Sequence, residues 1–131
     1  MHFVLVSEAN PNLVLDIAGA SKEKGAHLIV WEHNGGENQL FHLSEKGFIT
    51  SKHSGLVIDI QKGVHEGHHI IQWESHGQAN QLWRLAKDGT IHLEGHDLVL
   101  TVEGGLHKGH KLIAAKNHGG LEQKWRVVTK Y

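Results

Sequence analysis

The chain has 131 residues, of which 39% are hydrophobic and 21% charged, and this length suffices for one domain with one core. No apolar run approaches the roughly 18 residues that cross a bilayer, and 13 Lys and Arg against 14 Asp and Glu give a net charge of −1 without a basic cluster. A transmembrane segment and general nucleic-acid binding are therefore excluded, and the absence of cysteine excludes disulfides and thiolate zinc sites.

The first apolar segment, residues 3–6 (FVLV), is too short for the core of a signal peptide, and no small-residue cleavage site follows it. The sequence thus shows no signal peptide. The compartment stays open between the cytoplasm and release from the cell by a non-classical route.

The segments that follow recur three times along the chain. The first type is 13–17 (LVLDI), 56–60 (LVIDI) and 98–102 (LVLTV). The second type is 25–29 (GAHLI), 67–71 (GHHII) and 109–113 (GHKLI). The third type is 39–41 (QLF), 81–83 (QLW) and 123–125 (QKW). The steps are 42 residues throughout, apart from one residue inserted in the first copy between Asp16 and Gly25.

Each recurring segment is short, rich in Val, Ile and Leu, and bounded by Gly, Asn, Asp or Ser, which is the pattern of strands and turns. About four strands in each ~42-residue unit predict about twelve strands in an all-β fold. We expect a single domain, residues 1–131, with repeats at about 1–46, 47–88 and 89–131. A propeller needs at least four blades, so three copies predict a threefold pseudo-symmetric barrel. The residues expected to meet near its axis are Leu13, Leu56, Leu98, Ile29, Ile71, Ile113, Phe41, Trp83 and Trp125.

Three Gln-x-Trp units in register, each preceded by a Leu-Val-Leu-Asp-Ile strand and a Gly-x-x-Leu-Ile-x-Trp strand, resemble the R-type lectins, the ricin B-chain-like β-trefoil family. The resemblance covers essentially the whole chain. It departs from the family pattern in two ways: Phe41 replaces the first tryptophan, and the cysteines common in secreted members are absent. The resemblance implies a twelve-stranded β-trefoil that binds sugars.

In such lectins, an Asp accepts hydrogen bonds from two sugar hydroxyls, an aromatic ring stacks on the apolar face of the sugar, and an Asn before Gln-x-Trp completes the site. The resemblance implies that the first repeat binds carbohydrate through Asp16, Trp31, Asn34, Asn38 and Gln39. It implies that the second repeat does so through Asp59, Trp73, His76, Asn80 and Gln81. The third repeat has Thr101, Ala115, Glu122 and Gln123 at these positions, so we expect two working sites and one degenerate site.

Several of these residues have an alternative interpretation. Asp16 and Asp59 could bond a local turn, and Trp31 and Trp73 could be core residues, because residues two apart on a strand share a face. If Ile29 points inward, Trp31 reaches the surface only where the strand ends. The glutamines persist in the degenerate repeat, which indicates mainly structural work, with hydrogen bonds to the loop backbone.

The 14 histidines suggest a rival function. Protonation of all of them would change the net charge from −1 to +13 near pH 6–7. The chain is similar in this respect to the hisactophilin-like β-trefoils, which bind actin and membranes in a pH-dependent way. A protein-binding trefoil adaptor is a further alternative.

Residues 65–69 (HEGHH) match the metalloprotease motif H-E-x-x-H, but that motif requires a helix, and this segment contains a central glycine and aligns with repeat turns. We therefore expect no metal site, no cofactor and no enzymatic activity. The expected partners are galactose- or N-acetylgalactosamine-terminated glycans of glycoproteins or glycolipids. A homodimer through Ala114, Ala115 and Leu121 of the third repeat is a possible further partner.

Overall fold

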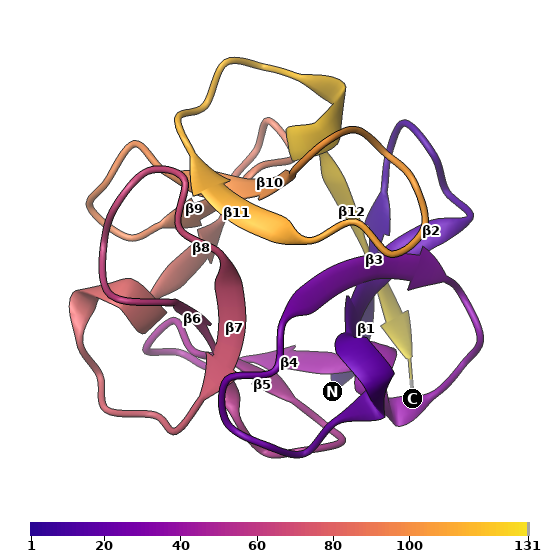
Figure 1. Cartoon of the computed structure of the whole chain (residues 1–131), viewed down its shortest axis with the longest axis horizontal. Helices are drawn as coiled ribbons and strands as arrows, with labels where there is room; N and C mark the ends of the chain where they lie inside the picture. Colours follow the sequence, from indigo (N-terminus) through magenta and orange to yellow (C-terminus); the bar gives the residue numbers. More distant parts are fainter. Residues whose placement is uncertain (131) are drawn as a thin grey trace.

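The computed structural model describes residues 1–130, which form twelve β-strands and four short 3-10 turns. The strands are β1 (His2–Ser7), β2 (Leu13–Ile17), β3 (Leu28–Glu32), β4 (Phe41–Leu43), β5 (Ile49–Ser51), β6 (Val57–Ile60), β7 (Ile70–Trp73), β8 (Trp83–Leu85), β9 (Ile91–Leu93), β10 (Val99–Val102), β11 (Leu112–Ala115) and β12 (Trp125–Lys130). The turns are η1 (Ala18–Ala20), η2 (Glu37–Gln39), η3 (Ala79–Gln81) and η4 (Leu121–Gln123). The predicted all-β fold with four strands in each repeat is confirmed, and the three repeats surround one central axis (Figure 1).

The strands pair antiparallel in the order of a β-trefoil. β1 pairs with β2, β4 and β12, so that His2 lies opposite Lys130 and the two chain ends lie side by side (Figure 1). From β1 the sheet continues through β2 to β3 and through β4-β5-β6 to β7, while β8-β9-β10-β11 form a second, four-stranded sheet. Gly47 joins the two sheets, because its carbonyl accepts a hydrogen bond from the Trp83 amide at 2.8 Å. A Cβ at this glycine would stand 3.1 Å from the Trp83 carbonyl oxygen, so the backbones approach closely only without a side chain.

The aromatic residues of the third recurring segment form the centre of the core, as predicted. Phe41, Trp83 and Trp125 are all buried in one apolar cluster. The two indole N–H groups find backbone partners at the first recurring segment: Trp83 donates to the Ile58 carbonyl at 3.1 Å and Trp125 to the Leu100 carbonyl at 3.3 Å. A buried polar atom needs such a partner. Phe41 has no polar atom to satisfy.

Part of the core prediction is wrong by one residue. Leu28, Ile70 and Leu112 are fully buried in the axial core, whereas Ile29, Ile71 and Ile113 lie on the opposite face of their strands. Side chains alternate along a strand, so a shift of one residue exchanges the two faces, and two adjacent apolar residues do not show which one points inward. Leu56 is only half-buried, while Leu13 and Leu98 join the core as expected.

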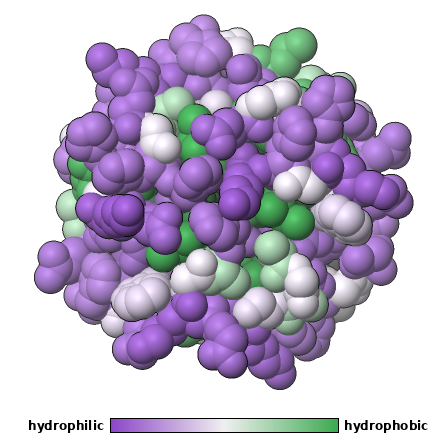
Figure 2. Space-filling model, in the orientation of Figure 1, coloured by the Kyte–Doolittle hydropathy of each residue, from purple (hydrophilic) through white to green (hydrophobic). Residues whose placement is uncertain are grey.

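Neighbouring repeats contact each other where the hairpins β2-β3, β6-β7 and β10-β11 meet at one end of the barrel. Isolated bridges join His27 to Ile71, His69 to Ile113, and Lys111 to Ile29. Each hairpin is therefore held by the repeat beside it. The surface over this end is mainly hydrophilic, with small separated hydrophobic areas (Figure 2).

Two expectations about segments are also settled by the fold. The segment 61–68, which contains most of the H-E-x-x-H match, is a turn and not a helix, as predicted. Over residues 1–130, no helix has the length and apolar character needed to cross a membrane.

Candidate functional site

The first repeat brings four distant residues to one pocket. Asp16 comes from β2, Trp31 from the end of β3, Asn34 from the following loop, and Asn38 from η2. They line a hollow of about 360 Å³ together with Gly19, Ala20 and Ile29. The hairpin β2-β3 and the turn η2 therefore assemble the predicted residues, with Gln39 directly behind them.

The carboxylate of Asp16 is held by two amide donors. Asn38 Nδ2 donates to Oδ1 at 3.0 Å, and Gln39 Nε2 donates to Oδ2 at 2.8 Å. Only 3% of Asp16 is exposed, yet the residue lines the pocket. Since each carboxylate oxygen accepts up to two hydrogen bonds, one lone pair on each remains for a ligand.

Gln39 does mainly structural work. Its Nε2 also donates to the Glu32 carbonyl at 2.8 Å, and its Oε1 accepts from the Asn34 amide at 2.9 Å. The side chain thus ties the end of β3 and the following loop to the aspartate. A fully buried amide with both of its polar groups engaged offers little to a ligand.

The second repeat reproduces this arrangement. Asn80 and Gln81 donate to the two oxygens of Asp59, each at 2.7 Å, and Gln81 also bonds the Glu74 carbonyl and the His76 amide. The pocket has a volume of about 340 Å³. The residues that line it are Gly25, Asp59, Gln61, Lys62, Gly63, Ile71, Trp73, His76 and Asn80.

His76 is the main difference between the two sites. It takes the place of Asn34, and its Nε2 lies 3.6 Å from Oδ2 of Asp59. The Gln78 amide donates to His76 Nδ1 at 3.0 Å, so the neutral ring carries its proton on Nε2, toward the aspartate. The second site therefore has a titratable group where the first has an amide.

Burial dominates the electrostatics of both aspartates. Loss of hydration raises the pKa of Asp16 above its usual value, although the hydrogen bonds from Gln39 and Asn38 oppose this. Burial likewise raises the pKa of Asp59, against the hydrogen bond from Gln81 and the charge of His76. Each site thus holds a carboxylate at a cost in free energy, which a ligand that donates hydrogen bonds can offset.

Trp31 and Trp73 lie at the surface, each 38% exposed. Both share a strand face with the isoleucine two residues earlier, and Ile29 and Ile71 line the pockets rather than the core. Because Ile29 and Ile71 point away from the axial core, Trp31 and Trp73 on the same strand faces are accessible. Each ring forms one wall of its pocket.

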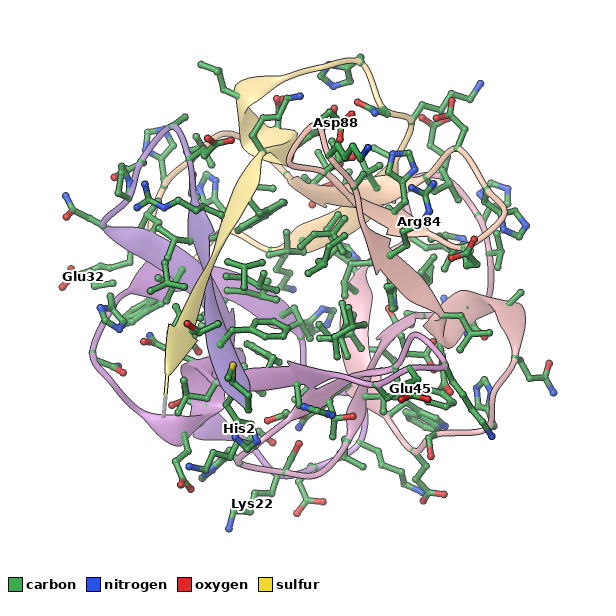
Figure 3. All side chains as sticks on the ribbon, turned by 180° about the vertical axis from the view of Figure 1, so that it is seen from behind. His2, Lys22, Glu32, Glu45, Arg84 and Asp88 are labelled. Atoms are coloured by element: carbon green, nitrogen blue, oxygen red, sulfur yellow. The ribbon has the colours of Figure 1, made fainter. Side chains whose placement is uncertain are left out.

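A loop from a neighbouring repeat supports each indole. Lys108 of the third repeat places Nζ 5.0 Å from the centre of the Trp31 ring and pairs with Glu32 at 2.8 Å. Glu32 lies at the outer edge of the first repeat (Figure 3). A Cβ on Gly109 would stand 3.6 Å from the edge of the Trp31 ring. The first site is thus completed by the third repeat.

The second site repeats this support with residues of the first repeat. Lys24 Nζ lies 5.3 Å from the centre of the Trp73 ring and 2.8 Å from Glu74. A Cβ on Gly25 would stand 3.9 Å from the edge of the Trp73 ring, and Gly25 lines the second pocket. Neither lysine is among the residues that line the pocket beside its tryptophan.

The third repeat keeps the glutamine without the other groups. Gln123 Nε2 donates to Thr101 Oγ1 at 3.2 Å and to the Lys116 carbonyl at 2.8 Å. The Thr101 hydroxyl in turn donates to the Val99 carbonyl. With Ala115 and Glu122 at the remaining positions, this repeat has neither the buried carboxylate nor the indole.

The loop 61–66 was expected to influence glycan specificity, but the individual residues that complete the lining of the two pockets were not predicted. Gly19 and Ala20 line the first pocket, and Gln61, Lys62 and Gly63 line the second. The position of Gly63 in a turn segment could have indicated a role for it, but nothing in the sequence marks Lys62 as a pocket residue. The cross-repeat contacts of Lys24 and Lys108 also lacked a sequence signal. No group of three or more His, Asp or Glu residues within 1–130 is arranged to hold a metal ion.

Comparison with known proteins adds the following. The sequence profile of the ricin-type beta-trefoil lectin domain matches residues 2–125. A designed threefold symmetric protein, ThreeFoil, superposes with a TM-score of 0.91 at 29% identity, over 98% of this chain and 99% of that chain. The C-half of an earthworm R-type lectin, in complex with GalNAc, gives 0.87 at 29% identity over 98% of each chain. A mutant of an earthworm lectin C-terminal domain, in complex with 6'-sialyllactose, gives 0.83 at 30% identity, also over 98% of each. The search of curated protein sequences found no match.

Proposed function

This chain belongs to the family of ricin-type β-trefoil lectin domains and is a lectin that binds carbohydrate, and from that premise we propose that it recognises galactose and N-acetylgalactosamine residues of glycoproteins or glycolipids. Binding takes place at two sites. The first site consists of Asp16, Trp31, Asn34, Asn38 and Gln39, and the second of Asp59, Trp73, His76, Asn80 and Gln81. The third repeat does not bind sugar.

One observation carries this proposal: the same buried aspartate, held by an Asn and a Gln beside an exposed indole, occurs in two repeats. A pyranose has one apolar C–H face and several hydroxyls. The indole suits the apolar face, while the free lone pairs of the carboxylate accept hydrogen bonds from two adjacent hydroxyls. The pocket volumes fall within the range of small-ligand sites.

The choice of galactose-type sugars is supported by the relative solved with GalNAc, which has 29% sequence identity to this chain. Binding occurs without catalysis in this proposal. A glycosidase places two carboxylates across one bond, whereas Asp16 and Asp59 line separate pockets in different repeats.

Each site alone binds weakly. A shallow pocket with a few hydrogen bonds and one stacked ring gives millimolar to high-micromolar dissociation constants, about −4 to −6 kcal/mol. Two sites on one chain make the protein bivalent, which raises the avidity for a surface that displays many glycans by roughly 10²-fold or more.

The test is a glycan array probed with the purified protein at about pH 5 and pH 7.5, which brackets histidine titration, with and without free galactose as competitor. We expect binding to glycans that end in galactose or N-acetylgalactosamine, and displacement by galactose. The double variant Asp16→Ala, Asp59→Ala is the matched control and should give a blank array. A blank array with the native chain at both pH values would contradict the proposal, as would binding that survives in the double variant.

A further inference from the structure

The two pockets differ in several of the residues that line them. In the first pocket, these positions are occupied by Gly19, Ala20 and Asn34, none of which carries charge. In the second pocket, Lys62 and His76 stand in their place. An Asp, an Asn, an Ile and a Trp line both pockets, so the residues that can give the two pockets different ligand preferences are those that they do not share, Lys62 and His76 among them.

Lys62 occupies a backbone conformation that favours glycine. Its φ is 65°, and the residue 42 positions later, Gly104, has a φ of 82°. A non-glycine residue at such an angle carries strain, and strain of this kind concentrates at functional sites. Lys62 lines the second pocket, just as Ala20, a further non-glycine residue with a positive φ of 51°, lines the first.

A second hollow adjoins the second pocket. It has a volume of about 520 Å³ and is lined by Lys46, Phe48, Ser75, His76, Gly77 and Leu82. His76 belongs to both hollows and therefore forms their shared border. A ligand longer than one sugar can pass over His76 into a space with an aromatic ring, Phe48, and a cation, Lys46.

The charges of this region favour an anion. Within residues 1–130, neither Lys46 nor Lys62 forms an ion pair, whereas Lys24 is neutralised by Glu74 and Lys108 by Glu32. Glu45 precedes Lys46 in the chain but does not line the hollow. The carboxylate of Asp59 accepts hydrogen bonds from the neutral amides of Asn80 and Gln81, so its negative charge remains in the pocket that Lys62 also lines. Lys62 and Lys46 thus line two hollows that share His76, and Asp59 is the one carboxylate among the residues that line either hollow.

We propose that the second site selects an acidic oligosaccharide. Asp59 and Trp73 hold the galactose-type residue, Lys62 and Lys46 bind a carboxylate or sulfate on that residue or on the sugar attached to it, and the attached sugar lies against Phe48. This inference rests on the proposed function. The first site, with its uncharged wall, takes neutral glycans.

The test separates the two sites by substitution. The variant Asp16→Ala leaves only the second site, and Asp59→Ala leaves only the first. Each is titrated by calorimetry with lactose, sulfated lactose and sialyllactose. With Asp16→Ala, we expect an acidic ligand to bind about fivefold more tightly than lactose, the upper range for an exposed ion pair, and the advantage to disappear at roughly 0.5 M salt. With Asp59→Ala, neutral and acidic ligands bind alike.

Added substitutions then identify the groups responsible. In the Asp16→Ala background, Lys46→Ala together with Lys62→Gly should abolish the preference for acidic ligands. Glycine suits the backbone at position 62, so this variant keeps the fold. The control is Lys22→Ala, because Lys22 projects into solvent from the first repeat (Figure 3) and should leave the preference intact.

The outcomes distinguish the inference from its premise. If Asp16→Ala binds lactose and both acidic ligands equally, the inference is overturned while galactose recognition stands. The same holds if the preference survives without Lys46 and Lys62. If the native chain binds none of the three ligands, the proposed function itself fails. A preference for only the sulfated or only the sialylated ligand supports the inference and identifies the anion.

Discussion

Gln39 donates a hydrogen bond from Nε2 to Oδ2 of Asp16 over 2.8 Å, inside the protein and behind the first pocket. Gln81 stands in the same relation to Asp59, and Gln123 bonds Thr101 where no aspartate exists. The glutamine thus holds the strand end and the following loop in every repeat, whereas the aspartate is present only in the first and second repeats. This separation predicts that substitutions of the two residue types have different consequences.

Replacement of the aspartates should remove binding and spare the fold. Each single variant, Asp16→Ala or Asp59→Ala, should reduce the calorimetric stoichiometry for galactose from two to one, and the double variant should not bind. The melting temperature should change by about 3 °C or less, because the lost hydrogen bonds are offset by removal of a buried charge. Thr101→Ala, the control in the third repeat, should leave the stoichiometry at two. Unchanged binding by the double variant would refute the assigned roles.

Replacement of the glutamines should have the reverse effect. Gln123→Ala leaves the Lys116 carbonyl and the His118 amide without their buried partner and should lower stability by about 2–3 kcal/mol, or about 7–10 °C in melting temperature. Sugar binding below that temperature should persist, since the third repeat has no site. Gln78→Ala, an exposed glutamine, is the control for thermal denaturation. An unchanged melting temperature of Gln123→Ala would show that the stability of the third repeat does not depend on this residue.

The raised pKa values of Asp16 and Asp59 predict how stability depends on pH. The folded state holds their protons more tightly than the unfolded state, so stability decreases as pH rises from their usual value of 3.8 through the raised folded values. The variant Asp16→Ala, Asp59→Ala should therefore gain stability relative to the native chain over this window and keep that gain at higher pH. Denaturant unfolding at a series of pH values measures the difference. A constant difference would show that burial does not perturb these groups.

The same shift predicts the acid limit of binding. A protonated aspartate loses acceptor capacity, so galactose affinity should fall on acidification before an ordinary aspartate would titrate, that is, above pH 3.8. Calorimetric titrations from neutral pH downward, with the fold monitored by circular dichroism, provide the measurement. Affinity that is maintained down to the ordinary aspartate range would contradict the assignment of the carboxylates as acceptors.

The repeat pattern was sufficient to predict the fold, because three copies of a segment with Gln followed two residues later by an aromatic residue, and of two strand segments, specify an architecture that one copy does not. The face of Ile29 was not predictable, since Leu28 and Ile29 are both apolar and differ only in which side of the strand they occupy. The resemblance to R-type lectins implied that Asp16, Trp31 and Asn38 share one site, and the structure brings them together in one pocket. Lys24 and Lys108 were not foreseeable, because their partners lie in other repeats, and a solvated lysine carries no sequence signal for such a contact.

The lysines that contact the indoles should act across the repeat boundary. Lys108→Met removes the cation above Trp31 and should weaken the first site by about two- to fivefold, the range for an exposed cation–π contact, without affecting the second. Lys24→Met should weaken only the second. Galactose titrations in the Asp59→Ala and Asp16→Ala backgrounds isolate each site, and Lys22→Met is the control. Equal loss at both sites would indicate a general effect on the fold.

The third repeat should regain a site when its missing groups are restored. Thr101→Asp, Ala115→Trp and Glu122→Asn supply the acceptor, the platform and the amide next to the existing Gln123. Glu66→Lys adds the supporting cation, since residue 66 occupies the place of Lys24 and Lys108. No atom lies within 4 Å of a Cβ built on Gly67, so there is room beside the introduced indole. The stoichiometry for galactose should rise from two to three, and a value that stays at two would show that other residues closed the site.

Support from Lys108 and Gly109 has a consequence for how the chain can be shortened or can diverge. The third repeat has lost its own ligand groups, yet it provides the loop against which Trp31 rests. The dependence runs in one direction: the third repeat supports the indole of the first, and the first supports the indole of the second. A chain shortened to its first two repeats would therefore lose the lysine and the glycine that lie against Trp31, and with them the support of the first pocket.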